Sequence, residues 1–384
     1  MNMNEQMKES EESILHTYNR FPVVFEKGQG CYLYDSEGKE YLDFAAGIAV
    51  NSLGYHYPGY DEALKDQIDK LMHISNLYYN EPIIEAGAKL VKASKMSKAF
   101  FTNSGTEAIE GALKAAKKYA YVRDGHADHE IIAMNHSFHG RSIGALSVTG
   151  TAHYREPFEP LMGGVKFADF NNLESVKAQI TDKTCAIITE VVQGEGGIYP
   201  AKKEFLEGLR QICDEKDIML IFDEIQCGMG RTGHYFAWQA YGVQPDIMTS
   251  AKALGCGVPV GAFVLSEKAA KASLEPGDHG TTYGGNPFVC AAVSKVFDIY
   301  ENDKIIEHVQ EMTPYLEQKL DEIVAKHECA ATRRGMGFMQ GIVIQGRPVG
   351  EVVKAALAKG LLVISAGSDV LRIVPPLVIT KEHI

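Results

Sequence analysis

Near the middle of the chain the sequence reads Ile218-Met219-Leu220-Ile221-Phe222-Asp223-Glu224-Ile225-Gln226. The unbroken apolar run predicts a short strand that is buried on both faces, as in parallel sheets. Asp223 would then stand at the carboxyl end of that strand, and this is the edge at which open α/β sheets bind ligands. Because an Asp after a strand is more commonly a turn or helix-cap residue, Asp223 alone does not identify a site.

A lysine with unusual neighbours follows in the string Thr249-Ser250-Ala251-Lys252-Ala253-Leu254-Gly255. Most lysines are solvated surface cations, but small and apolar neighbours predict a desolvated amine with a lowered pKa and a nucleophilic neutral form. A lysine that can form an imine and an aspartate that can pair with a ring nitrogen are together what pyridoxal phosphate requires.

The pattern along the chain predicts an α/β fold with a mostly parallel sheet that is covered on both faces. A β-hairpin is expected over 31–44, and one long helix and two strands are expected after residue 287 in a second, smaller lobe. The expected helices cover 60–71, 83–93, 107–121 and 288–305, and the expected strands cover 98–101, 130–133, 185–188, 218–222, 339–344 and 361–364.

Composition narrows the classes of function. The chain has 384 residues, enough for two lobes, and its formal net charge of −12 argues against nucleic acid or an anionic membrane as the main partner. It has no apolar run long enough to span a bilayer and no signal-peptide pattern, so a cytoplasmic location is expected. Its 7 scattered cysteines predict neither a disulfide framework nor a zinc site. Thr380 could begin a helix, and the expectation is that such a helix continued beyond Ile384.

Two further strings could hold an anion or a flat ring. Ser104, Gly105 and Thr106 open a helix after an apolar strand, a geometry that binds phosphate, although an ordinary capping box with Ser104 and Glu107 is an equal alternative. In His136-Ser137-Phe138-His139-Gly140-Arg141 the two histidines lack further metal ligands, so no metal site is expected. Phe138 could stack on a pyridine ring and Arg141 could bind a carboxylate, although each residue type alone is more often a core or surface residue.

Glycine-rich loops and one cation complete the candidate residues. A loop over 190–197 follows another strand, and the loop over 278–287 offers hydroxyls for a second phosphate contact. Arg372 lies within an apolar strand and needs a partner, which is Glu195, a substrate carboxylate, or each in turn.

Taken together, these strings resemble those of the class III pyridoxal-phosphate aminotransferases of fold type I, most closely the acetylornithine aminotransferases, over nearly the whole chain. The resemblance implies a large domain with a mostly parallel seven-stranded sheet and a smaller α+β domain from both chain ends. It places the N-terminal arm and part of the small domain in 1–55, the cofactor-binding domain in 56–287, and the rest of the small domain in 288–384. The strings that carry it lie at 103–108, 138–141, 223–226, 228–233, 250–252, 279–287 and 371–376.

The resemblance also implies a role for each candidate residue. Lys252 would bind pyridoxal 5'-phosphate and move the proton, and Asp223 would keep the ring nitrogen protonated. Substrate binding would involve Arg141 on the donor's α-carboxylate, and Glu195, which shields Arg372 until 2-oxoglutarate arrives. The remaining predicted contacts are Gly105 and Thr106 to phosphate, Phe138 and Ile225 to the two ring faces, Gln226 to the phenolic oxygen, Thr282 of the neighbouring subunit to phosphate, and Thr281 and Tyr18 to substrate.

The implied reaction is transfer of the terminal amine of N2-acetylornithine to 2-oxoglutarate in arginine biosynthesis, by a homodimer with active sites at the subunit interface. Ornithine aminotransferases have a tyrosine near Ile48, which offers no contact to a free α-amine, so an acylated donor is favoured. Two departures from the family pattern, Tyr55 and Ile109, lie near the entrance. The alternatives are the same chemistry on succinyl-diaminopimelate, ornithine or 4-aminobutyrate, or a regulatory protein that binds the cofactor without catalysis.

Overall fold

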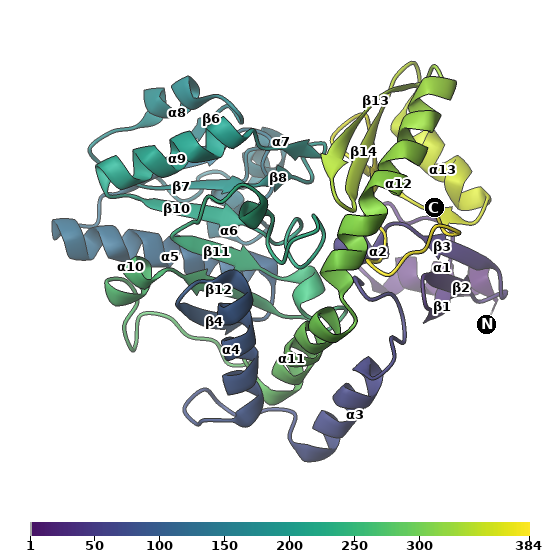
Figure 1. Cartoon of the computed structure of the whole chain (residues 1–384), viewed down its shortest axis with the longest axis horizontal. Coiled ribbons are helices and arrows are strands. Elements are labelled where there is room, and N and C mark those ends of the chain that lie inside the picture. The colour runs from purple at the N-terminus through teal and green to yellow at the C-terminus, as the bar shows by residue number, and fades with distance from the viewer. Residues whose placement is uncertain (1) are drawn as a thin grey trace.

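The structure, a computed structural model, describes residues 2–384 and has a seven-stranded sheet at its centre (Figure 1). Strand β12 runs antiparallel to both of its neighbours, and the other neighbouring pairs are parallel, which confirms the mostly parallel sheet. In sheet order the strands are β4 (Lys98–Thr102), β12 (Gly261–Leu265), β11 (Ile247–Ser250), β10 (Met219–Asp223), β7 (Thr184–Glu190), β5 (Glu130–Met134) and β6 (Val165–Ala168).

Strand β10 shows why its sequence is apolar at every position. Met219 and Ile221 pack into one hydrophobic cluster, while Leu220 and Phe222 pack into another. Since successive strand residues point to opposite faces, the two clusters cover the two faces of the sheet. A strand buried in this way can place its last residue, Asp223, at the sheet edge without exposing its own side chains.

Helices cover both faces of this sheet (Figure 1). α5 (Gly105–Asp124) packs on β11 and β12, and α9 (Lys203–Lys216) packs beside β7 and β10 on the other face. The other helices of this region are α3 (Tyr60–Lys70), α4 (Glu81–Ser94), α6 (Ile143–Ser147), α7 (Ala152–Arg155), α8 (Leu173–Gln179) and α10 (Glu267–Lys271). Three 3-10 turns cover Glu156–Phe158, Ala237–Ala240 and Lys252–Leu254, and β8 (Val192–Gln193) pairs with β9 (Tyr199–Pro200).

The two ends of the chain meet in one mixed sheet. Strand β15 (Leu361–Leu362) pairs in parallel with β3 (Glu40–Asp43), which forms the expected hairpin with β2 (Tyr32–Asp35). The other N-terminal elements are α1 (Met3–Ser13), β1 (Phe25–Gln29) and α2 (Ala46–Ala49). The other C-terminal elements are α11 (Pro287–Asn302), α12 (Ile305–Lys326), β13 (Ala330–Met336), β14 (Met339–Ile344), α13 (Val349–Ala358), β16 (Ile364–Ala366) and β17 (Val370–Ile373). The division into domains at residues 55 and 287 stays a prediction.

Two expected elements are wrong in their extent. The helix expected over 288–305 ends at Asn302, because Lys304 adopts a left-handed conformation (φ 53°) that breaks it before α12 begins. The strand expected over 361–364 is divided between two sheets, since Leu361 pairs with Leu42 and Ile364 pairs with Arg372. Residues 381–383 form a turn. Within residues 2–384 no helix is long and apolar enough to cross a membrane.

Candidate active site

A cavity of about 480 Å³ lies at the carboxyl ends of β10 and β11, as the strand-edge argument predicts. It brings together residues that are far apart in the sequence, since its wall is formed by the loops after β4, β5, β10 and β11, the last residue of β7, the segment before β12, and Val50. The predicted site residues that line it are Gly105, Thr106, Phe138, Arg141, Asp223, Ile225, Gln226 and Lys252.

Lys252 begins a 3-10 turn immediately after β11 and has a left-handed backbone conformation (φ 51°). Burial lowers the pKa of its amine to about 8, and the nearby Glu195 carboxylate opposes part of that shift. A substantial neutral fraction is therefore present near physiological pH, as a nucleophilic amine requires.

Asp223 is 4% exposed, and its carboxylate has three polar contacts. One carboxylate oxygen, Oδ1, accepts hydrogen bonds from Ile225 N (3.0 Å) and Thr249 Oγ1 (3.3 Å). The other, Oδ2, lies 2.7 Å from Nδ1 of His139, which is buried as well. The sequence indicates nothing more for His139 than a possible metal ligand, because its contact with Asp223 joins two loops whose proximity the sequence does not show.

Glu190 is a second buried carboxyl group in the cavity wall, and it is not among the residues that the sequence predicts for the site. Its oxygens accept hydrogen bonds from Gly194 N (3.1 Å) and Phe138 N (3.3 Å). Burial raises the pKa of Glu190 to about 7, with an opposing effect from His139. The signal that could have found it is the one that found Asp223, because both acids end a buried strand and the two are register partners.

The start of α5 combines helix capping with an open approach to the cavity. Ser104 Oγ accepts a hydrogen bond from Glu107 N (3.3 Å), so the capping interaction is present. Gly105 is a close-approach position, since a Cβ there would lie 2.9 Å from Ile225 Cδ1. The first amides of a helix have no partner within the helix and attract anions. Capping and anion binding are therefore compatible at this helix start.

The two predicted substrate arginines have different surroundings. Arg372 is 3% exposed, and its guanidinium donates to Glu195 Oε1 (2.5 Å) and Oε2 (3.3 Å), to Gln226 Oε1 (3.1 Å) and to Ser365 O (3.0 Å). Arg141 is exposed, and among residues 2–384 it has no hydrogen bond or ion pair with the protein. One arginine is thus masked by a carboxylate, while the other has free donors.

Five predicted site residues do not line the cavity within one chain: Glu195 and Arg372, which pair with each other beside Gln226, and Tyr18, Thr281 and Thr282. Tyr18 is 72% exposed, and Thr282 is exposed as well. Thr281 Oγ1 accepts a hydrogen bond from Asn103 Nδ2 (3.1 Å), and Asn103 does line the cavity. The roles given to these five residues, like those of the residues that line the cavity, stay predictions.

The candidate metal ligands of the sequence are not gathered into a site, because His136 is exposed and His139 contacts Asp223. A group not singled out in the sequence, Asp124, His126 and His129, has ligand atoms within 4.8 Å of one another at the far end of α5. Arg123 already donates to both carboxylate oxygens of Asp124 (2.6 Å each), which disfavours a cation there.

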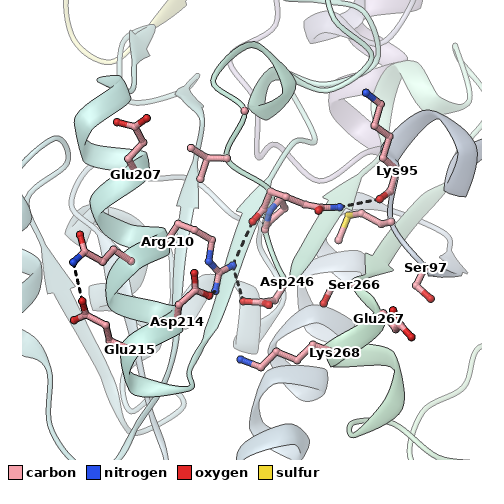
Figure 2. Close-up of a pocket in the computed structure, with 16 residues that line it drawn as sticks. Lys95, Ser97, Glu207, Arg210, Asp214, Glu215, Asp246, Ser266, Glu267 and Lys268 are labelled. Carbon is pink, nitrogen blue, oxygen red and sulfur yellow. Dashed lines mark hydrogen bonds and ion pairs between the residues drawn. The ribbon is translucent and has the colours of Figure 1, made fainter.

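A larger hollow of about 1160 Å³ lies at the opposite edge of the sheet, where Asp246 precedes β11 (Figure 2). Figure 2 shows Arg210 between Asp214 and Asp246, to which it is bonded at 2.8 and 2.9 Å. Because these charges pair with one another and no perturbed nucleophile is among them, we assign this hollow a structural role rather than a catalytic one.

A buried lysine and a buried aspartate at neighbouring strand ends, with two arginines around them, agree with the class of enzyme that the sequence resembles. The chain matches the family model "Aminotransferase class-III" over residues 14–384, and it belongs to that family. It is 48% identical to an acetylornithine aminotransferase of Clostridium acetobutylicum, covering 98% of this chain and 97% of the relative.

Other relatives have related names. A succinylornithine transaminase of Yersinia pseudotuberculosis is 44% identical, covering 97% of this chain and 92% of the relative. The crystal structure of an ornithine aminotransferase from Toxoplasma gondii superposes with a TM-score of 0.95 at 29% identity, over 100% of this chain and 92% of that one. An N-acetylornithine aminotransferase from Stenotrophomonas maltophilia superposes with a TM-score of 0.84 at 36% identity, over 98% and 94%.

Proposed function

We propose that this protein is a pyridoxal-phosphate aminotransferase that moves the terminal amine of N2-acetylornithine to 2-oxoglutarate. The products would be N-acetylglutamate 5-semialdehyde and glutamate, in arginine biosynthesis. The observation that carries the proposal is the buried amine of Lys252, with a pKa near 8, in one cavity with Asp223 and Arg141. The relatives named acetylornithine aminotransferase support the choice of donor.

The residues of the cavity fit pyridoxal phosphate. The start of α5 offers helix amides to a phosphate, and the absence of a Cβ at Gly105 leaves that approach open beside Ile225. Phe138 presents a flat side chain in the wall, and Asp223 presents a buried carboxylate. When bound, the cofactor supplies an aldehyde that condenses with amines and a ring that accepts the electron pair released at the substrate carbon.

Asp223 and Lys252 would share the proton chemistry. The Asp223 carboxylate would hold a proton on the pyridine nitrogen, and the contact between His139 Nδ1 and Asp223 Oδ2 fixes the position of that carboxylate. Lys252 Nζ, when neutral, would take the proton from the substrate carbon that bears the amine and return it to the carbon of the cofactor's former aldehyde group, on the other side of the shared nitrogen.

The two arginines would divide the substrates between them. Arg141 has free donors and would bind the α-carboxylate of the amino donor bidentately. Arg372 is neutralised by Glu195, so it would not attract the donor's carboxylate until Glu195 turns away for 2-oxoglutarate. One cavity could then accept two chemically different substrates in turn.

The segment of Ile48 supports an acylated donor. Ile48 is 43% exposed in α2, and it offers neither a hydroxyl nor a charge to a free α-amine. A donor whose α-amine is acylated does not need such a contact.

Steady-state kinetics with four donors would test the proposal. We expect kcat/KM to be highest for N2-acetylornithine, followed by succinyl-diaminopimelate, ornithine and 4-aminobutyrate in any order. A preference for free ornithine would contradict the choice of substrate. Cofactor absorbance that stays unchanged on addition of every donor would contradict catalysis altogether and support a regulatory binding protein.

A homodimer with shared active sites is part of the proposal, as is a cytoplasmic location. The dimer is supported by the loop of Thr281 and Thr282, which does not line the cavity of its own chain. It is supported as well by the exposed apolar side chains of Leu77, Tyr78 and Tyr79, which are 86%, 65% and 96% exposed in the single chain. Apolar surface of this kind on one segment is typical of a protein interface.

A further inference from the structure

Aromatic rings, not carboxylates, surround the guanidinium of Arg141. Its Cζ lies 4.0 Å from the ring centroid of Tyr154 and 5.4 Å from that of Phe138. The two rings stand edge to face, with centroids 6.0 Å apart and planes at 84°. Arg141 is therefore held beside two aromatic side chains that contact each other.

This arrangement differs from that of Arg372 in a way that matters for binding. An aromatic ring attracts a guanidinium through the ring face and leaves the N–H donors in the guanidinium plane unused. At Arg372 those donors are occupied by Glu195, Gln226 and a carbonyl oxygen. Arg141 is thus oriented without losing the donors that a substrate carboxylate would need.

Tyr154 is itself fixed by its surroundings. It lies in the short helix α7, where it is half-buried and packs against His153 with ring centroids 5.5 Å apart. The next residue, Arg155, donates to Thr149 O and lies 4.1 Å from the ring centroid of Phe167. Tyr154 also lines a second hollow of about 830 Å³ together with Glu195, here called the outer groove, so it borders this groove and contacts Arg141 of the cavity wall.

We propose that Tyr154 is a positioning residue that fixes the Arg141 guanidinium for the α-carboxylate of the amino donor. The inference rests on the proposed function, because it assumes that Arg141 binds that carboxylate. Tyr154 would then contribute to the preference for ω-amines that carry an α-carboxylate. Its side chain need not touch the reacting atoms to do so.

The test compares two donors that differ only in the carboxylate, N2-acetylornithine and N-acetylputrescine. In the holoenzyme, Tyr154→Leu should raise the KM for N2-acetylornithine about 3- to 30-fold, the range expected for loss of a cation–π contact, while kcat changes less. The kcat/KM for N-acetylputrescine should not change, because that donor gives Arg141 nothing to bind. Tyr154→Phe keeps the ring and should restore the KM.

Tyr199 provides a matched control in the same outer groove. Its ring lies 3.6 Å from the Cζ of a different arginine, Arg334, so Tyr199→Leu should leave the ratio of the two donors unchanged. In an Arg141→Met background, Tyr154→Leu should have no further effect on the KM for N2-acetylornithine.

Two outcomes would overturn the inference: an equal loss of kcat/KM for both donors, or an unchanged KM in Tyr154→Leu. A failure of the proposed function is distinguishable from these. If the wild-type protein rejects N2-acetylornithine but uses ornithine, the substrate proposal fails, and the pair ornithine and putrescine then tests Tyr154 in the same way. A wild-type protein that does not distinguish the donors of either pair would overturn the role of Tyr154 as well.

Discussion

At Lys252, burial rather than a neighbouring cation is the main cause of the lowered pKa, and this predicts a pH dependence. The neutral amine is the form that condenses with an aldehyde, and its fraction rises about tenfold per pH unit below the pKa. The rate at which cofactor-free protein captures pyridoxal phosphate should therefore rise with pH and flatten above about 8.

Absorbance of the bound cofactor after rapid mixing would measure that rate across pH. The control is a solvated lysine side chain in a model peptide. Its rate of reaction with pyridoxal phosphate should continue to rise until about pH 10.4. If the capture rate of the protein depended on pH in the same way as that of the peptide, Lys252 would not be desolvated in solution.

Replacement of Lys252 should abolish turnover and leave the fold intact. In Lys252→Ala we expect kcat to fall at least about 100-fold, since both the amine that binds the cofactor and the proton carrier are lost. Circular dichroism should be unchanged. Lys268→Ala is the control, because Lys268 lies in the hollow at the opposite sheet edge, where it pairs with Asp217 (2.7 Å), and its loss should not affect kcat. Normal turnover by Lys252→Ala would refute the role given to this residue.

At the scale of elements, the ends of the strands carry the chemistry at one edge of the sheet and stabilise the fold at the other. Asp246 Oδ2 accepts a hydrogen bond from Leu220 N (2.9 Å) and pairs with Arg210 Nη1 (2.9 Å), so it connects β10, β11 and α9 (Figure 2). The Asp246 side chain is only 8% exposed and that of Arg210 19%, so loss of either charge would leave the other poorly solvated.

Asp246→Asn should therefore destabilise the protein by about 1–3 kcal/mol, because the largely buried Arg210 would keep only the exposed Asp214 as its ionic partner. A lowered midpoint of urea unfolding would show it. Glu207→Gln on the same helix is the matched control, because its pair with Lys203 is exposed and long (3.7 Å), and it should change stability by less than about 0.5 kcal/mol. Equal shifts in the two variants would contradict the structural role of Asp246.

The sequence predicts the large sheet well because each of its strands has a local signal, a continuous apolar run that two buried faces require. The sequence predicts an element less accurately where the backbone conformation of one residue or pairing with other strands determines where the element ends. The break between α11 and α12 depends on the backbone conformation of Lys304. The strand expected over 361–364 is divided because its first residues pair with β3 and its last residue pairs with β17.

The same distinction applies to the candidate site. Lys252, Asp223 and the start of α5 are visible as motifs, since each lies at the end of a strand or within three residues after it. His139, Glu190 and Tyr154 are recognised only through contacts with residues of other loops.

For the whole molecule, the exposed apolar segment around Tyr79 predicts association of two chains. A second copy that covers it would remove a large apolar area from water, with a gain of about 25 cal/mol per Å². Leu77→Asp combined with Tyr79→Asp should therefore shift the mass in solution from dimer to monomer, as measured by light scattering.

The double variant should lose affinity for the cofactor as well, if Thr282 of the partner subunit contacts the phosphate. Ile323→Asp is the control, because Ile323 is 43% exposed on α12, and this change should leave the mass unchanged. A wild-type protein that is monomeric at micromolar concentration would contradict the shared active site.

The pairing of β3 with β15 also has a consequence for how the chain is made. Lys39 Nζ donates to Ala358 O across 319 positions, and Leu42 has Leu361 as its strand partner. During synthesis the N-terminal hairpin emerges first. The edge of β3 that pairs with β15 stays unpaired until almost the whole chain has left the ribosome. The hairpin edge is thus a site where a nascent chain is exposed to misassembly or to a chaperone for most of its synthesis.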